Sequence, residues 1–461
     1  MRTPVQMAGM RELEEAEAPG IDWGWGMEPA IPGSVAVRAP REVRPVLSIG
    51  VFTTRLKLGK LRLHGVLLCA RSLGKKDRGG SGNGRYRGTG DGVLRGLGVL
   101  YFLHLFSDSG LEAFGVFRAV TFRAAFAALF AFIMCVTLGP HVIAWLRQRK
   151  YGENTQKSDS EFIAQKHAAK SGTPTMGGVI LVASTLCAVA LFARSDVVFV
   201  PLAFFTMLAL ALVGFYDDWI KLTRKEKGLT IREKLCFQAV VGLGVGYLLY
   251  AYSPSGARGA VAVPFVEAAF WPTLGYGYLI WAGVVLTASS NAVNLTDGLD
   301  GLATLCTITV AVAFGLMAYF SGHAGMAQHL AVPRVPGAEE LAVICAALAG
   351  ACLGFLWFNA HPAEVFMGDT GSLALGGLVG LVALSIKQEL MLVLVGGVFV
   401  AEALSVLIQI ASFRWFGRRV FRIAPLHHHF EKVGWPETKI VSRFFIVSVL
   451  LAVFSIATLR V

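Results

Sequence analysis

The sequence predicts an all-α polytopic membrane protein with about ten transmembrane helices, both termini outside and its functional loops in the cytoplasm. Hydrophobic residues make up 55% of the 461 residues and charged residues 16%, a balance too apolar for an ordinary soluble domain of this size. Apolar runs of spanning or near-spanning length recur from residue 124 onward, and the connections between them alternate between strongly and weakly basic. Seven cysteines lack CxxC spacing, so neither a zinc site nor a disulfide framework is expected.

The apolar runs define the predicted helices in order. Their approximate limits are 124–145, 176–193, 197–215, 235–252, 270–288, 302–320, 341–358, 373–386, 390–410 and 444–459. The run 373–386 is shorter than the roughly 20 residues that a helix needs to cross a bilayer.

The basic residues orient the predicted bundle. The connections 146–175, 216–234 and 411–443 each hold at least six Lys and Arg residues, whereas the even-numbered connections carry little positive charge. Because cytoplasmic loops are enriched in Lys and Arg, the odd-numbered connections are expected in the cytoplasm. The net charge of +12 is therefore assigned to membrane topology, and no nucleic-acid partner is expected.

Residues 1–98 differ from the rest of the chain. They combine an acidic stretch, several prolines and a glycine-rich segment at 79–92, a composition that buries little apolar surface. We expect a disordered or non-native extension, followed by one polytopic domain at 99–461. The predicted topology would place this basic segment outside, so our hypothesis is that much of it lies upstream of the natural start or is a dispensable tail. The intact mass of protein made from the native locus tests this.

The stretch 291–302 is the most polar segment between two apolar runs. It contains Asn294, Asp297 and Asp300, and each Asp at a helix centre would cost roughly 2.5 to 3.5 kcal/mol in a bilayer. Gly298 permits close approach of a bound group. We expect a loop that wraps a polar ligand at the membrane boundary; the alternative is an ordinary polar hairpin.

Two adjacent carboxylates, Asp217 and Asp218, end the third apolar run. They repel each other, and a helix C-terminus disfavours anions, so a cation should lie nearby. Lys221 is spaced for a surface ion pair with either one. The alternative is Mg²⁺ with a diphosphate substrate, because Mg²⁺ takes one or two carboxylates together with phosphate oxygens.

Two further motifs begin predicted helices. Lys170 and Thr175 belong to a glycine-containing segment that suits anion binding at a helix start or, alternatively, a Thr-Pro helix beginning. In the stretch 355–373, Asn359 and Phe366 resemble a hydrogen-bonding group and a stacking platform for a base. Asp369 in the same stretch, or Thr370 or Ser372 after it, could instead cap the next helix.

The last motif contains three consecutive histidines, His427, His428 and His429. Only the first and third would share a face of an extended chain, so a three-histidine metal site is not expected. Phosphate binding or proton transfer fits better than a solvated loop. Glu402 and Gln409 are polar residues within the ninth apolar run, where such groups usually have a function.

Taken together, these motifs resemble the bacterial phospho-N-acetylmuramoyl-pentapeptide transferase (MraY) family of the polyprenyl-phosphate N-acetylhexosamine-1-phosphate transferase superfamily. Asp217-Asp218, the stretch 294–301 and Asp369 resemble the superfamily, and the segments 174–178 and 425–429 are similar to the muramoyl-pentapeptide branch. The resemblance implies a multi-pass protein of the bacterial inner membrane. It would transfer phospho-MurNAc-pentapeptide from UDP-MurNAc-pentapeptide to undecaprenyl phosphate, giving lipid I and UMP.

The resemblance also implies roles for individual residues. Asp369 and Asp218 would bind Mg²⁺, and Asp217 and His427 would complete the catalytic set. The implied uridine pocket consists of Lys170, Gly298, Leu299, Asp300, Asn359 and Phe366. Further substrate contacts would come from Thr175, Lys221, Lys234, Asn294, Asp297, Gln409, His428 and His429.

Two other functions compete with this interpretation. A sister transferase would use UDP-GlcNAc with the same chemistry. An ion-coupled transporter would place its acidic groups near the bilayer midplane, where Glu402 is the one candidate. The sequence leaves the oligomeric state open, a homodimer included.

Overall fold

The computed structural model describes residues 50–52, 67–69, 100–101, 112–149, 172–223, 228–253, 258–264, 266 and 272–460. The chain divides into two units, Met1–Tyr86 and Arg87–Val461. In the first unit, β1 (Gly50–Phe52) and β2 (Leu67–Cys69) pair antiparallel, with Gly50 opposite Cys69. The rest of the expected extension 1–98 lies outside the described residues, so its disorder and its boundary stay predictions.

The second unit is a bundle of helices. Among the described residues, nine helices are long and apolar enough to span a membrane. They are α1 (Val120–Gln148), α4 (Phe199–Thr223), α5 (Ile231–Tyr252), α6 (Gly277–Thr296), α7 (Leu302–Gly322), α9 (Glu339–Asn359), α10 (Gly368–Ser385), α12 (Gly397–Phe416) and α14 (Glu437–Ala457). With the shorter apolar helix α3 (Gly178–Phe192), all ten apolar runs contain a helix, which confirms the predicted all-α multi-pass fold. The sides of the membrane on which the termini and loops lie stay predictions.

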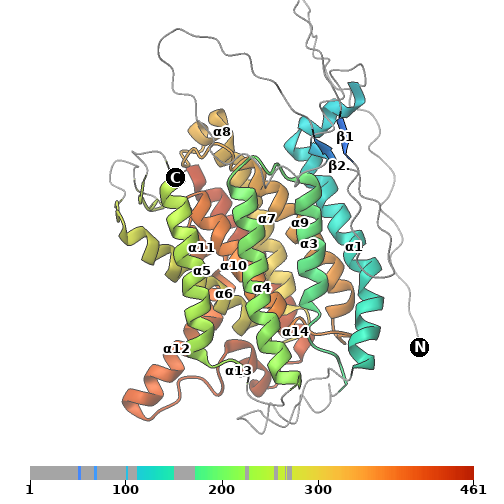
Figure 1. The fold of residues 1–461 in the computed structure, drawn as a ribbon. Coiled ribbons are helices and arrows are strands. Elements are labelled where there is room, and N and C mark those ends of the chain that lie inside the picture. The colour runs from blue at the N-terminus through green and yellow to red at the C-terminus, as the bar shows by residue number, and fades with distance from the viewer. Residues whose placement is uncertain are drawn as a thin grey trace, which may run out of the picture. The chain divides into compact units, whose positions relative to one another are not determined.

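Short helices occupy the connections. They are η2 (Glu112–Arg118), α8 (Ala324–His329), α11 (Met391–Val395), α13 (Leu426–Val433) and η6 (Thr458–Arg460). Helix α8 lies at one end of the bundle and α13 at the other (Figure 1).

Two predicted helices differ from the structure. Helix α6 begins seven residues later than expected, after a stretch in which Thr273 forms a β-bridge with Ala260. The ninth apolar run is broken at Gly396 into α11 and α12. A β-carbon at Gly397 would lie 2.7 Å from Leu451 Cδ1, so the glycine at this break lets the chain approach α14 closely.

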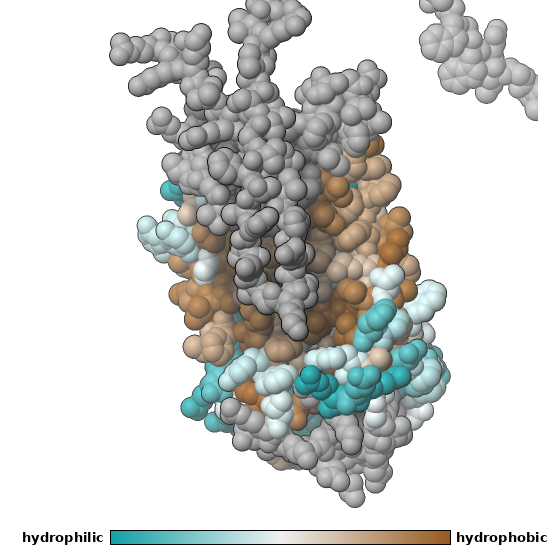
Figure 2. All heavy atoms as spheres, turned by 45° about the vertical axis from the view of Figure 1, so that its right-hand side comes forward, coloured by the Kyte–Doolittle hydropathy of each residue, from teal (hydrophilic) through white to brown (hydrophobic). Residues whose placement is uncertain are grey.

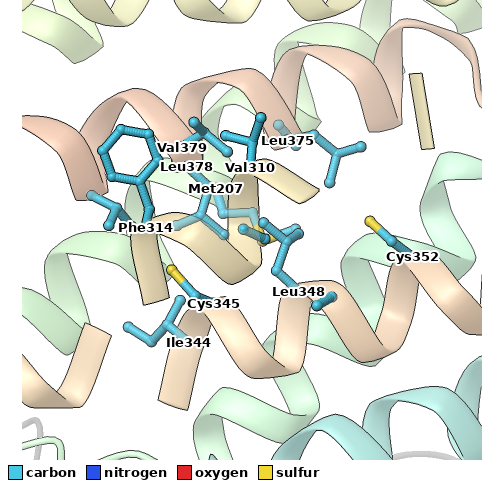
Figure 3. Packing of buried hydrophobic residues seen from close by; sticks show 14 of the residues in the cluster. Met207, Val310, Phe314, Ile344, Cys345, Leu348, Cys352, Leu375, Leu378 and Val379 are labelled. Carbon is cyan, nitrogen blue, oxygen red and sulfur yellow. The ribbon is translucent and has the colours of Figure 1, made fainter. Parts of the chain in front are cut away.

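Helices α9 and α10 form the centre of the bundle. Helix α9 packs against α1, α3 and α7, and α10 packs against α4 and α6 (Figure 1). Figure 3 shows the core between these helices, where Met207 of α4, Phe314 of α7, Ile344 of α9 and Leu378 of α10 belong to one hydrophobic cluster. Such packing makes α10 and α9 the most buried of the nine helices, with 89% and 78% of their most apolar stretches inside the protein.

The surface of the bundle is divided by polarity. Figure 2 shows hydrophobic residues over the middle of one face and a band of hydrophilic residues across its lower end, where α13 lies in Figure 1. Large apolar side chains such as Leu407 and Val240 are more than half exposed. Exposed apolar side chains of this density suit contact with lipid, so the chain is a multi-pass membrane protein.

Candidate active site

Three carboxylates from two helices meet at the end of the bundle where α13 lies. Asp217 and Asp218 lie near the end of α4, and Asp369 lies in the first turn of α10. Each offers an oxygen within 4.8 Å of the others. The side chains of Asp217 and Asp218 are buried, and that of Asp369 is 13% exposed. The structure therefore unites two motifs about 150 positions apart in the chain.

Glycines allow these two helices to approach so closely. A β-carbon at Gly214 of α4 would overlap the Asp369 carbonyl oxygen. Gly368 adopts φ +73°, which L-residues rarely adopt, and a β-carbon there would lie 2.8 Å from Asp218 Oδ2. Side chains at either position would push α4 away from the start of α10.

Asp218 caps α10. Its Oδ1 accepts from the Asp369 amide at 3.2 Å, and its Oδ2 accepts from the Thr370 amide at 3.0 Å and the Thr370 hydroxyl at 2.7 Å. The first amides of a helix have no partner within the helix, and an anion there is favoured by the helix dipole. The predicted capping of this helix is thus performed by Asp218 from a different helix.

Asp217 is held by one amide and two lysines. The Leu229 amide donates to Oδ1 at 2.6 Å, and Oδ2 lies 2.6 Å from Lys221 Nζ and 2.8 Å from Lys234 Nζ. Both lysines also contact Asp369, Lys221 at 3.1 Å. The predicted ion pair of Lys221 with Asp217 is present, and it forms part of a larger cluster of three carboxylates and two ammonium groups.

Asn294 joins this carboxylate–lysine cluster from α6. Its Nδ2 donates to Asp369 Oδ1 at 2.9 Å and to Ser372 Oγ at 2.8 Å. The expectation of a loop over 291–302 is wrong for its first half, because α6 continues to Thr296 and only the next five residues form a turn. Contact with α10 satisfies the carboxamide without unwinding the helix. Ser372 was considered only as a cap of α10, and its contact with Asn294 was not predicted.

Asn359 fixes the turn that follows Asn294. Its Oδ1 accepts from the Gly301 amide at 3.2 Å and the Thr304 hydroxyl at 3.0 Å, and its Nδ2 donates to the Val365 carbonyl at 3.0 Å. Both ends of the carboxamide are thus used within the protein. This arrangement gives Asn359 a structural role; the expected contact with a base is untested.

The same turn carries a second group of titratable side chains. Asp300 Oδ2 lies 2.9 Å from His361 Nδ1, and the Asp300 amide donates to Glu437 Oε1 at 2.8 Å. Leu299 beside it is buried. His361 and Glu437 were not predicted; His361 lies two residues after Asn359, but Glu437 at the start of α14 carries no such signal.

The segment containing Thr175 runs alongside Phe366. The Phe366 amide donates to the Pro174 carbonyl at 2.9 Å, and the Gly177 amide donates to the Phe366 carbonyl at 2.8 Å. A β-carbon at Gly368 would lie 3.1 Å from Thr175 Oγ1, which places that hydroxyl at the carboxylate–lysine cluster. Lys170 of the same motif lies outside the described residues.

The three histidines lie on α13, a short helix rather than an extended segment. His427 is buried, with its ring against Gly298. His428 Nδ1 lies 2.8 Å from Glu431 Oε2, and His429 Nδ1 accepts from the Arg422 amide at 3.1 Å. Successive side chains of a helix point about 100° apart, so the three rings have different partners. His427 lies against the turn Asp297–Gly301 through its contact with Gly298.

Gln409 is engaged away from these side chains. Its Oε1 accepts from the amides of Val420 and Phe421 at 3.1 and 2.9 Å, and its Nε2 donates to the Phe421 carbonyl at 3.0 Å. These bonds close the connection between α12 and α13. The expected substrate contact of Gln409 remains a prediction.

Two comparisons with protein families match the chain. The model of glycosyl transferase family 4 matches residues 200–387, which include all three carboxylates and both lysines. Signature 1 of phospho-N-acetylmuramoyl-pentapeptide transferase matches residues 170–182, the segment that runs alongside Phe366.

Proposed function

Because the chain belongs to the phospho-N-acetylmuramoyl-pentapeptide transferase family, we propose that it transfers phospho-MurNAc-pentapeptide from UDP-MurNAc-pentapeptide to undecaprenyl phosphate. The products would be lipid I and UMP, and the site would face the cytoplasm at the bacterial inner membrane. The membership itself supports a transferase of phosphorylated sugars and implies a nucleotide-sugar-peptide substrate and a lipid carrier.

One observation carries this proposal: the cluster of Asp217, Asp218, Asp369, Lys221 and Lys234 lies at the end of an apolar bundle. A lipid phosphate remains in the bilayer, and a nucleotide sugar comes from water, so the two can meet only at such a boundary. Carboxylates and ammonium groups together suit a diphosphate and its counter-cation.

The carboxylates fit a magnesium ion. Their oxygens lie within 4.8 Å of one another, and hard oxygen donors are what Mg²⁺ prefers. We propose that Asp369 and Asp218 would hold it. Bound there, Mg²⁺ would neutralise the diphosphate and make UMP a better leaving group.

The two lysines and Asp217 would organise the phosphates. Lys221 and Lys234 now bridge Asp217 and Asp369, and their ammonium groups are placed to bind phosphate oxygens instead. Asp217 would then position the lipid phosphate. A phosphate monoester has its second pKa near 6, so the acceptor is largely a dianion at neutral pH and needs no strong base.

We therefore favour a single displacement over an intermediate on an aspartate. An oxygen of the lipid phosphate would form a bond to the phosphorus next to the sugar, and the bond from that phosphorus to the oxygen of UMP would break. Gly298, Leu299, Asp300 and Phe366 would form the uridine pocket with Lys170, and Asn294, Asp297 and Thr175 would surround the diphosphate.

The test is UMP release by the purified protein with undecaprenyl phosphate, supplied separately with UDP-MurNAc-pentapeptide and with UDP-GlcNAc. We expect release with the first donor only. Release with UDP-GlcNAc alone would assign the sister activity.

A second experiment tests the metal site. UMP release by Asp369→Asn is measured with and without magnesium, and near-normal turnover of this variant would remove Asp369 from the metal site.

A further inference from the structure

Glu402 is a carboxylate inside a helix that is apolar enough to span a membrane. Its side chain is fully buried within α12. Such a group is costly in a bilayer and usually has a named partner. Among the described residues, the hydrogen-bond and ion-pair partners of this carboxylate all belong to His427.

The Glu402 carboxylate contacts two different atoms of His427. The His427 amide, in the first turn of α13, donates to Oε1 at 3.2 Å and to Oε2 at 3.4 Å. The ring atom Nδ1 lies 3.2 Å from Oε2. The carboxylate can therefore both cap α13 and orient the imidazole ring.

The opposite edge of the ring is directed at the turn between α6 and α7. A β-carbon at Gly298 would overlap His427 Nε2, so this nitrogen lies directly against the Gly298 backbone. His427 is 1% exposed, and neither ring nitrogen makes a hydrogen bond in the part of the chain that the structure describes. Nδ1 has the Glu402 carboxylate 3.2 Å away, whereas Nε2 has no ion-pair partner among these residues. Buried polar atoms usually have a hydrogen-bond partner, so this nitrogen is available to a ligand atom or a water molecule.

We propose that Glu402 is a positioning residue that acts through His427. It holds a hydrogen on Nδ1 and fixes the ring, so that Nε2 is presented at the Gly298 turn to the phosphorylated sugar of the donor. Nδ1 keeps its hydrogen in both the neutral and the protonated ring, so Nε2 alone changes its hydrogen-bonding role. This inference rests on the transferase function proposed above.

Glu402→Gln separates this role from simple capping. The Gln carbonyl oxygen can still accept from the His427 amide, so the cap of α13 is kept. The second position becomes an NH₂ donor, which favours an Nδ1 without hydrogen and therefore the wrong tautomer. We expect kcat to fall at least tenfold with little change in KM or in the midpoint of thermal unfolding.

A double-mutant cycle supplies the readout that a structural role would not give. His427→Asn places a carboxamide near the Nδ1 position and removes Nε2, and Glu402→Gln/His427→Asn should be no slower than His427→Asn alone. With Glu402 unchanged, His427→Gln should have a higher kcat than His427→Asn, because the side-chain amide of Gln can reach the Nε2 position.

Glu389→Gln is the matched control. Glu389 is a second buried carboxylate, in the turn after α10, and its replacement should leave kcat unchanged.

The outcomes separate the two proposals. If the wild-type protein releases no UMP from either donor, the proposed function fails and this inference fails with it. If the wild type is active, a Glu402→Gln variant with a kcat within twofold of the wild-type value would overturn the positioning role. So would a double variant whose loss of kcat equals the product of the two single losses. Equal kcat values for His427→Asn and His427→Gln would also overturn it. A lowered unfolding midpoint with kcat retained would reduce Glu402 to a cap.

Discussion

Asp218 of α4 accepts two hydrogen bonds from Thr370 of α10, one from the amide at 3.0 Å and one from the hydroxyl at 2.7 Å. A helix that begins inside the bundle thus receives its cap from a neighbouring helix. The same carboxylate belongs to the proposed magnesium site, so one side chain links the stability of the bundle to its chemistry.

Removing this cap should destabilise the protein. We expect Asp218→Ala to lower the free energy of unfolding by about 1 to 3 kcal/mol, because the Thr370 amide and hydroxyl lose their acceptor. Asp218→Asn keeps one acceptor oxygen and should cost less. Thermal unfolding in detergent measures both, and equal midpoints for wild type and Asp218→Ala would contradict the cap.

A methyl group at Gly298 should inactivate the enzyme. Gly298→Ala would overlap His427 Nε2 and displace the ring, so we expect UMP release to fall at least tenfold, which corresponds to about 1.4 kcal/mol. Gly244→Ala is the control, because a β-carbon at that position of α5 meets nothing within 4 Å. Equal turnover by the two variants would show that His427 is not held against the turn.

The buried pair of Arg123 and Glu340 should behave differently when one or both members are replaced. Arg123 Nη1 and Nη2 donate to the two Glu340 oxygens at 2.6 Å, and both side chains are fully buried. Glu340→Gln should cost about 3 to 5 kcal/mol of unfolding free energy, because it leaves an unpaired buried charge.

The double variant Arg123→Met/Glu340→Met removes both charges of this pair. It should recover much of the stability lost by Glu340→Gln, since apolar replacements leave no buried charge. Unfolding midpoints of the three proteins decide between these outcomes. A double variant less stable than the single one would mean that the pair contributes net stability.

Glu389 should make the stability of the protein depend on pH. Burial raises the pKa of Glu389 from its ordinary value of 4.5 to about 7. The folded protein then binds a proton that the unfolded chain releases, so this residue should lower stability as pH rises from about 4.5 to 7. Glu389→Gln should remove that loss, up to about 3 kcal/mol at pH 8. Parallel pH profiles of the unfolding midpoint for both proteins would contradict this.

The membrane helices could be predicted because each apolar run carries its own signal. The run 341–358 is α9 within two residues at its start and one at its end, since a helix that satisfies its backbone internally needs only local composition. Predicted helix boundaries were wrong where a contact between helices decides them, as at the break between α11 and α12, where Gly397 approaches α14. The motif residues were predicted because they are polar residues in apolar surroundings. This signal does not indicate which residue each of them contacts.

By itself, the sequence determined that this chain spans a membrane, and it supplied the carboxylates, lysines and His427 that make up its polar sites. Only the tertiary structure decided how they are used: that Asp218 caps α10, that Gln409 closes a connection, and that Glu402 contacts His427. The free energy of transferring an apolar segment out of water is a sum over the residues of that segment, so it can be estimated from the local sequence. Hydrogen bonds between residues far apart depend on how closely two helices approach, and glycines such as Gly214 set that distance only once the helices are packed.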